Sequence, residues 1–237
     1  MKVGLFDSGV GGLSVLKRLM EKYPNNEYIY FGDTKNLPYG SKSIEELKIL
    51  AKNNIEFLLK FNVDIIVIAC GTVSSNCLDY LKDNYNIPII DIISPTINYL
   101  NNSNYNNIGV IATEATINSH IFKNNINKNI YEIATPKLVP LIEGTTTDDL
   151  EKVLNEYLND YIDKIDVLIL GCTHYPLVSN SIKKVIGNST KLINMADYIT
   201  IDDYGEGKVK IYFSKIDDKL IDNVKKIIDI DNIYLNN

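Results

Sequence analysis

The sequence contains little of what marks several large classes of protein. Its 237 residues include only 13 glycines and 7 prolines, too few for a collagen-like or disordered chain. No apolar stretch approaches the length that crosses a membrane, and only a short apolar run separates Lys2 from Asp7, so we expect no secretion signal. With 45% hydrophobic residues the chain can bury a large core. These features predict a globular, cytoplasmic protein.

Basic residues are fewer than acidic ones, and cysteines are few. The formal net charge is −6, which argues against nucleic acid or a membrane surface as the main partner and favours a small polar ligand. There are 3 cysteines, an odd number, and in a reducing compartment they are better explained as thiols than as a disulfide framework. The sequence therefore raises the question of what Cys70, Cys77 and Cys172 do.

Apolar runs alternate with helical patterns along the chain. Helical periodicity is clear at residues 11–23 and 43–61. This alternation predicts an α/β protein with a mostly parallel sheet and helices on its faces. The Asn-rich stretch at residues 100–107 breaks the order and is the predicted seam between two lobes. We predict strands at residues 3–6, 28–31, 64–70, 87–93, 108–112, 137–141, 166–171, 191–193 and 208–213.

An internal repeat also predicts two lobes. Residues 3–9 resemble residues 108–114, and residues 64–72 resemble residues 166–174 at nearly the same offset. In the second pair each buried strand ends in a cysteine followed by small or hydroxyl-bearing residues. If two similar lobes face each other about a pseudo-twofold axis, the two cysteines lie across a cleft from one another. The alternative is that two buried strands merely look alike and that both cysteines pack as small apolar residues.

The residues around these thiols suggest how they are activated. A cysteine where a strand opens onto a helix lies near backbone N–H groups and the positive end of the helix dipole, which lower a thiol pKa from about 8.5. We therefore expect a thiolate to be accessible at neutral pH at each of these cysteines. His174 lies two residues after Cys172 and can donate a proton or hold a substrate group. Asp7 and Ser8 end the first strand at the same edge of the sheet.

The third cysteine and the second histidine are predicted to be structural. Cys77 lies seven residues after Cys70, two turns along the helix that follows, which favours a packing role. His120 stands in a helical stretch and is expected to have no polar partner. Neither residue is expected to take part in chemistry.

The first strand and its glycine turn also imitate a dinucleotide-binding fingerprint. "VGLFDSGVGGLS" followed by "YIYFGD" supplies a strand, a glycine turn, a helix, a second strand and then an acid, Asp33. The third glycine of the fingerprint falls at Ser14, however, and Asp7 would place a negative charge beside the pyrophosphate. A nucleotide-binding protein with structural thiols is therefore the second hypothesis. The cysteines and histidines lack paired zinc-ligand spacing, so no metal is expected.

Five motifs in order resemble the cofactor-independent glutamate racemases of the aspartate/glutamate racemase superfamily. They are "GLFDSGVGGLSVL", "YFGDTKNLPYGSKS", "IVIACGTVSS", "VPLIEG" and "LILGCTHYPL", and the likeness runs from residue 3 to about residue 178. The resemblance implies two α/β lobes with mostly parallel sheets, related by a pseudo-twofold axis, with the active site in the cleft between them. The expected domains are residues 1–97 plus about 205–237 for the first lobe and residues 98–204 for the second.

The resemblance implies an isomerase that interconverts L- and D-glutamate without a cofactor. Inverting Cα requires removing a weakly acidic proton from one face and returning one to the other, which two opposed thiols can do as base and acid. The family pattern implies that Cys70 takes the proton of the D-isomer and Cys172 that of the L-isomer. No pyridoxal-binding lysine motif is evident, so fixed donors around the substrate carboxylate must stabilise the carbanion.

The resemblance also assigns residues around the two thiols. Asp33 and Glu143, together with His174, match positions that support the thiols, while a helix cap or a surface carboxylate is the alternative for both acids. An asparagine normally follows the first catalytic cysteine, whereas Gly71 stands here. Because glycine lacks that amide, glutamate is expected to bind weakly, and Gly71→Asn is expected to lower the Michaelis constant. Substrate contacts are expected at Asp7, Ser8, Tyr39, Gly40, Gly71, Thr72, Thr173 and His174.

The implied role is the supply of D-glutamate for peptidoglycan in the cytoplasm. The expected partner is a small amino-acid substrate, glutamate, with no nucleic acid and no membrane, and a homodimer is left open. The alternatives are a racemase of the same superfamily acting on aspartate or another amino acid, and a non-catalytic protein that binds an amino acid or a nucleotide.

Overall fold

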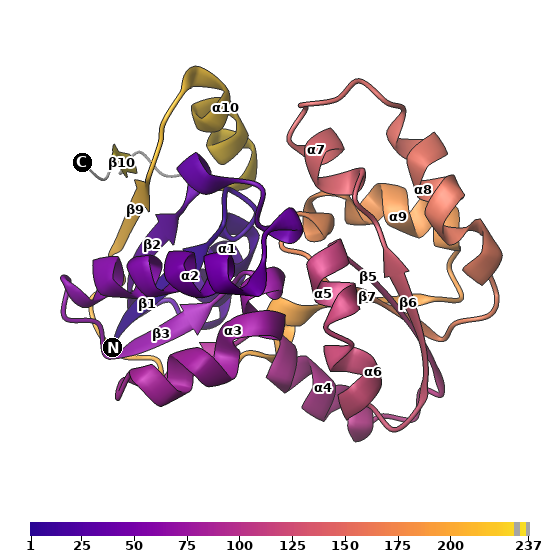
Figure 1. Cartoon of the computed structure of the whole chain (residues 1–237), viewed down its shortest axis with the longest axis horizontal. Helices are drawn as coiled ribbons and strands as arrows, with labels where there is room; N and C mark the ends of the chain where they lie inside the picture. The colour runs from indigo at the N-terminus through magenta and orange to yellow at the C-terminus, as the bar shows by residue number, and fades with distance from the viewer. Residues whose placement is uncertain (230–232, 236–237) are drawn as a thin grey trace.

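Two parallel sheets organise the chain. The structure is a computed structural model that describes residues 1–229 and 233–235. The first sheet has six strands in the order β10-β9-β2-β1-β3-β4, namely β1 (Lys2–Asp7), β2 (Glu27–Gly32), β3 (Ile65–Ile68), β4 (Ile89–Asp91), β9 (Val209–Phe213) and β10 (Ile233–Leu235). The second has four in the order β6-β5-β7-β8, namely β5 (Asn107–Ala112), β6 (Asn129–Ala134), β7 (Val167–Leu170) and β8 (Lys191–Asn194). We call each sheet with its covering helices a lobe, and Figure 1 shows the two side by side.

The two lobes repeat one strand order. The run β2-β1-β3-β4 of the first sheet corresponds to β6-β5-β7-β8 of the second, and every described strand pair is parallel. β1 thus corresponds to β5 and β3 to β7, which are the segments that the internal repeat matches. The prediction of an α/β fold with two similar lobes is confirmed.

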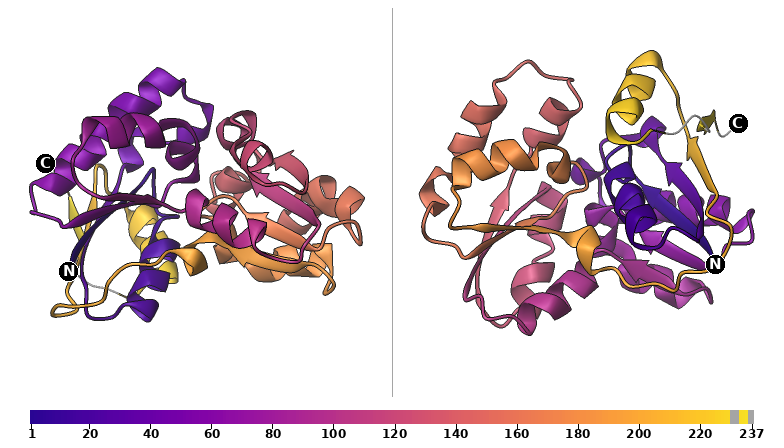
Figure 2. Two further views of the ribbon diagram at one scale, coloured as in Figure 1. Left: turned by 90° about the horizontal axis from the view of Figure 1, so that it is seen from below. Right: turned by 180° about the vertical axis from the view of Figure 1, so that it is seen from behind.

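After β8 the chain returns to the first lobe. β9 pairs with β2, so the segment that follows the second sheet in sequence completes the first sheet in space. Figure 2 shows this yellow segment, with its helix, against the indigo strands of the N-terminal region. The predicted domain boundaries, at 97/98 and near 205, stay a prediction that this arrangement supports.

Helices cover both sheets, and several begin at side chains that cap them. Ser43 and Glu46 form a capping box at the start of α2, while Asp149 and Asp217 cap α8 and α10 by accepting from backbone N–H groups. None of the described helices is long and apolar enough to cross a bilayer. The helices are α1 (Leu13–Lys22), α2 (Ile44–Leu59), α3 (Gly71–Asn84), α4 (Ile93–Asn101), α5 (Glu114–Asn118), α6 (Ile121–Asn125), α7 (Leu138–Ile142), α8 (Leu150–Leu158), α9 (Ser179–Ile186) and α10 (Asp218–Ile227).

The largest hydrophobic cluster is shared by the two lobes. It contains residues of the first sheet, such as Leu5, residues of the second, such as Val110, and Leu100 and Ile199 from the segments that connect them. Two further clusters lie within single lobes, one under α2 and α3 and one under α8 and α9. Because one core spans both sheets, burial of apolar surface holds the lobes against each other.

One predicted strand is wrong and two strands, β6 and β10, were missed. Every predicted strand except residues 137–141 is present, and that segment forms the short helix α7 instead. A short apolar run does not distinguish a strand from a buried helical turn. β6 (Asn129–Ala134) was missed because it is an edge strand whose outward positions are exposed and polar, so its apolar signal is weak.

The expectation that His120 has no polar partner is also wrong, while its structural role stays a prediction. The residue lies between α5 and α6 with a left-handed φ of 53°, and its side chain is about half exposed. Its Nδ1 lies 2.7 Å from Oε2 of Glu132 on β6. The polar partner comes from a strand that sequence periodicity did not reveal.

Candidate active site

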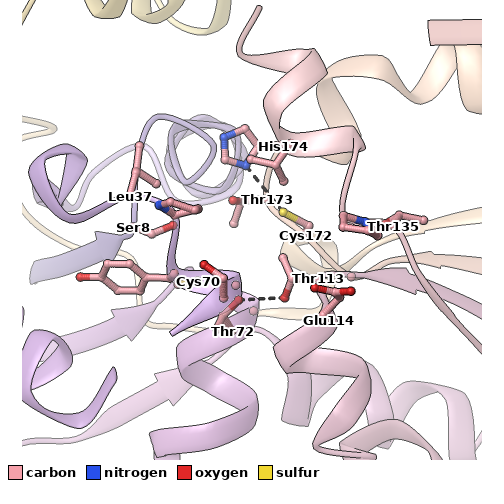
Figure 3. Close-up of a pocket in the computed structure, with 18 of the residues that line it drawn as sticks. Ser8, Leu37, Cys70, Thr72, Thr113, Glu114, Thr135, Cys172, Thr173 and His174 are labelled. Atoms are coloured by element: carbon pink, nitrogen blue, oxygen red, sulfur yellow. Dashed lines mark hydrogen bonds between the residues drawn. The ribbon is translucent and has the colours of Figure 1, made fainter. Parts of the chain in front are cut away.

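A cavity of about 130 Å³ lies between the lobes at the carboxyl ends of their central strands. This is well below the ~300–1,000 Å³ typical of drug-sized ligands and suits a small molecule. Cys70 and Cys172 line it from different lobes, and Figure 3 labels both. All of the predicted catalytic and substrate-binding residues line it: Asp7, Ser8, Tyr39, Gly40, Cys70, Gly71, Thr72, Cys172, Thr173 and His174.

The two cysteines occupy equivalent places in the two sheets. Cys70 follows β3 and is the N-cap residue of α3, and Cys172 follows β7. β3 and β7 each pair with the first strand of their own lobe, β1 or β5. Since parallel strands end at one edge of a sheet, both thiols lie where ligands bind in α/β folds. Cys77 instead packs in the apolar cluster under α2 and α3, as predicted.

Cys172 belongs to a chain of three titratable groups, of which Cys172 and His174 are buried and Glu143 is partly exposed. Its Sγ lies 3.6 Å from Nδ1 of His174, and Nε2 of His174 lies 2.8 Å from Oε1 of Glu143. Burial alone would lower the pKa of His174, but hydrogen bonds with Cys172 and Glu143 outweigh it and raise the pKa well above its ordinary value. A protonated imidazole donates from both ring nitrogens, so it stabilises negative charge on the sulfur and on the carboxylate.

Asp7 is fully buried, and only one of its two carboxylate oxygens has hydrogen-bond partners among the described residues. Its Oδ2 accepts from the backbone N–H of Gly12 at 2.7 Å and from the hydroxyl of Thr173 at 3.3 Å. Its Oδ1 is buried and has no hydrogen-bond partner among the described residues. Burial raises the pKa of this carboxyl, and the opposing effects of His174 and the backbone N–H groups offset it only in part. An unpaired buried acceptor on a cavity wall suits a ligand that donates, such as an ammonium group.

The prediction that the pKa of Cys70 is lowered is wrong. Burial raises the pKa of this thiol strongly, and the negative charge of Asp7 raises it further. The backbone N–H of Val73 at the start of α3 lowers it, but by less than burial raises it. Cys70 is therefore a protonated thiol at neutral pH, suited to act first as an acid.

Asp33 lies behind the cavity wall instead of beside a thiol. It accepts from the hydroxyl of Tyr39 at 2.6 Å, from the hydroxyl of Ser214 at 2.7 Å and from the amide of Asn36 at 2.9 Å. Asn54 also donates to the hydroxyl of Tyr39, at 3.1 Å. Asp33 therefore fixes Tyr39, which lines the cavity, and links it to Ser214 just after β9. Among the described residues it forms no hydrogen bond with Cys70 or Cys172.

Sequence reasoning missed Thr113, which lines the cavity from the second lobe. Its hydroxyl lies 2.9 Å from that of Thr72 and 3.0 Å from that of Thr116, so it joins the two lobes. The internal repeat aligns Thr113 with Ser8, one of the predicted substrate contacts. Carrying the predicted role of Ser8 across the repeat would have identified it.

The glycine turn after β1 serves the lobe interface and leaves no space for a pyrophosphate. A Cβ added to Gly11 would lie 2.5 Å from Nδ1 of His174, and the hydroxyl of Ser14 donates to the carbonyl of Thr173 at 2.8 Å. The N–H of Gly12, which could otherwise meet a phosphate, is bonded to Asp7. The second lobe therefore occupies the position that a dinucleotide would require.

Comparison with known proteins agrees with this geometry. A model of the Asp/Glu/hydantoin racemase family matches residues 8–197. The chain belongs to this family. The resemblance to glutamate racemases that the motifs predicted is confirmed.

Members of the family match nearly the whole chain. It is similar to glutamate racemase 3 of Caldanaerobacter subterraneus subsp. tengcongensis, with 40% identity over 96% of this chain and 90% of the relative. It is similar to a glutamate racemase of Hydrogenobaculum sp., with 37% identity over 96% and 93%. A glutamate racemase of Francisella tularensis in complex with D-glutamate has a similar structure, with a TM-score of 0.85 and 32% identity over 99% of this chain and 96% of that one.

Burial of the Asp7 carboxylate predicts that Asp7→Asn raises stability while impairing activity. A group whose pKa is raised by folding stabilises the fold below its unfolded pKa, about 3.9, and loses that contribution as the pH rises through its folded value. At pH 7 the neutral amide should therefore raise Tm above that of the parent. Calorimetry at several pH values measures this difference, which should vanish near pH 4. A variant less stable than the parent at pH 7 would contradict the account.

Proposed function

We propose that the protein interconverts L- and D-glutamate without a cofactor, with Cys70 and Cys172 as the two acid/base groups. The observation that carries the proposal is the pair of buried thiols at the ends of equivalent strands, on two sides of one small cavity. The substrate comes from the relatives, which include glutamate racemases and one bound to D-glutamate.

The two thiols divide the proton transfer between the faces of Cα. From L-glutamate, Cys172 as thiolate beside the protonated His174 accepts the Cα proton, and the C–H electron pair stays on carbon. Cys70, whose raised pKa keeps it protonated, then donates its proton to the opposite face. The product is D-glutamate, with Cys172 protonated and Cys70 as thiolate. The reverse reaction begins from that arrangement.

Apart from His174, the cavity recognises charge with neutral donors. Among the described residues, its lining contains the hydroxyls of Ser8, Thr72, Thr113 and Thr173 and the first residues of α3, but no lysine or arginine. Hydroxyls and the N–H groups at a helix N-terminus can donate to a substrate carboxylate, and they stabilise the charge that spreads into it when Cα is deprotonated. Asp7 Oδ1 accepts from the substrate ammonium group.

The cellular role rests on family membership alone. D-glutamate made in this way would enter peptidoglycan, and the enzyme would act in the cytoplasm on a freely diffusing amino acid.

The thiol assignment predicts that Cys70→Ala and Cys172→Ala each lower racemisation by at least ~10²–10⁴-fold, since each removes one of two required proton-transfer groups. Cys77→Ala, the matched control, should keep turnover within a few-fold because Cys77 only packs in the core. Circular dichroism of glutamate solutions measures both directions. An active Cys70→Ala enzyme, or an inactive but folded Cys77→Ala enzyme, would contradict the assignment.

A second prediction is that racemisation survives complete removal of metals and pyridoxal phosphate. Within the part of the chain that the structure describes, no lysine lines the cavity, and no group of three or more His, Cys, Asp and Glu side chains could hold a metal ion. The assay compares enzyme treated with a chelator and a carbonyl-trapping reagent with enzyme that is mock-treated. Activity that is lost and then restored by adding back either species would refute the prediction.

A further inference from the structure

A glycine contact joins the two turns that carry the thiols. Gly71 follows Cys70 at the start of α3, and Gly171 precedes Cys172 at the end of β7. A Cβ added to Gly71 would lie 2.7 Å from the carbonyl oxygen of Gly171, closer than real Cβ atoms approach. Only glycine fits at position 71 while the turns keep this separation.

Gly171 is held in place and cannot yield to a side chain at position 71. Its N–H donates to the carbonyl of Ile111 at 2.8 Å, which ties it to the end of β5. A Cβ added to Gly171 would meet that same carbonyl oxygen at 2.6 Å and Cβ of Ala112 at 2.9 Å. The obstacle to a side chain at position 71 is therefore backbone, not the end of a flexible side chain. Relief requires α3 to move away from β7.

We propose that Gly71 is a positioning residue whose missing side chain sets the separation of Cys70 and Cys172 across the cavity. This inference deepens the two-thiol proposal and rests on it. It also reverses the expectation drawn from the sequence that Gly71 marks a lost substrate hydrogen bond and that Gly71→Asn improves binding. The space that an asparagine side chain would need is occupied by the other lobe.

Hydrogen bonds around the glycine contact hold the lobes at this spacing. The hydroxyls of Thr72 and Thr113 lie 2.9 Å apart, and the Asn76 amide donates across the interface to the carbonyl of Ala115 at 3.2 Å. Asn76 also donates to the carbonyl of Thr72 at 2.9 Å, so its amide is engaged and does not replace the missing asparagine. A side chain at position 71 would strain all of these contacts together.

Thiol separation matters because both sulfurs must reach one carbon atom. Proton transfer needs the sulfur in near contact with Cα, and a misplacement of about 1 Å can cost ~10²-fold in rate. A wider lobe spacing acts on both transfers, because a substrate that stays close to one thiol then lies farther from the other. The effect should therefore fall on the chemical step more than on binding.

The test is a series of variants: Gly71→Ala, Gly71→Ser and Gly71→Asn. Each should lower kcat by about 10- to 100-fold with a smaller change in KM, and each should show a larger isotope effect with Cα-deuterated glutamate than the parent. The alanine variant separates volume from hydrogen bonding, since it adds a methyl group and no polar atom. An Asn variant with lower KM and undiminished kcat, or an Ala variant with parental kcat, would overturn the proposal.

Gly4→Ala is the matched control for added volume. Its new Cβ would lie 3.2 Å from the side chain of Val63 inside the first lobe, away from the lobe interface. It should alter Tm but leave kcat within a few-fold and the isotope effect unchanged. A fall in kcat as large as that of Gly71→Ala would overturn the proposal, because overpacking alone would then explain both.

Asn76→Ala keeps the proposal testable if no variant at position 71 folds. It removes the hydrogen bond to Ala115 without adding volume and does not alter the cavity lining. We expect kcat several-fold lower, a raised isotope effect and KM within about two-fold of the parent; unchanged kcat and isotope effect would overturn the proposal. Failure of the two-thiol mechanism is recognised separately, by activity that survives Cys70→Ala.

Discussion

The site depends on one constraint: the carboxyl ends of β3 and β7, each followed by a cysteine, are packed against each other. One apolar core extends from Leu5 in the first sheet to Val110 in the second, so burial presses the two lobes together. Both lobes have the same strand order, and each therefore presents an equivalent turn at this junction. The chain places a cysteine in each turn and a glycine where the turns touch. Two opposed thiols follow from the repeat and from the shared core.

Burial at this junction determines where the protons are. Removal from water raises the pKa of Cys70 and of Asp7, and the Glu143 carboxylate and Cys172 together keep His174 protonated. One thiol is thus poised to donate while the other faces an imidazolium. The unpaired Asp7 oxygen costs stability in the folded protein, a cost that functional sites commonly carry. The same desolvation strengthens every electrostatic interaction with a bound substrate.

Much of this arrangement could be predicted from the sequence because it is encoded locally. Buried strands are continuous apolar runs, and the residues at their ends identify the cavity wall. β6 was missed because its apolar signal is interrupted, and α7 was predicted as a strand because its apolar run is short. Three features depend on contacts between distant residues and have no local signature: the raised pKa of Cys70, the hydrogen bond from Tyr39 to Asp33, and the carbonyl of Gly171 against Gly71. Sequence patterns locate the thiols, and only tertiary packing sets their protonation and spacing.

Deuterium incorporation by the parent enzyme in heavy water tests most directly whether two groups act on opposite faces of Cα. At low conversion, the two enantiomers are separated and the isotope at Cα is measured by mass spectrometry. The account predicts that the product enantiomer carries solvent deuterium from the first turnovers while the recovered substrate carries none, in both directions, because the donating thiol exchanges its proton with solvent beforehand. Substrate that exchanges without inversion, or product that retains the original hydrogen, would show that a single base serves both faces and would contradict the account.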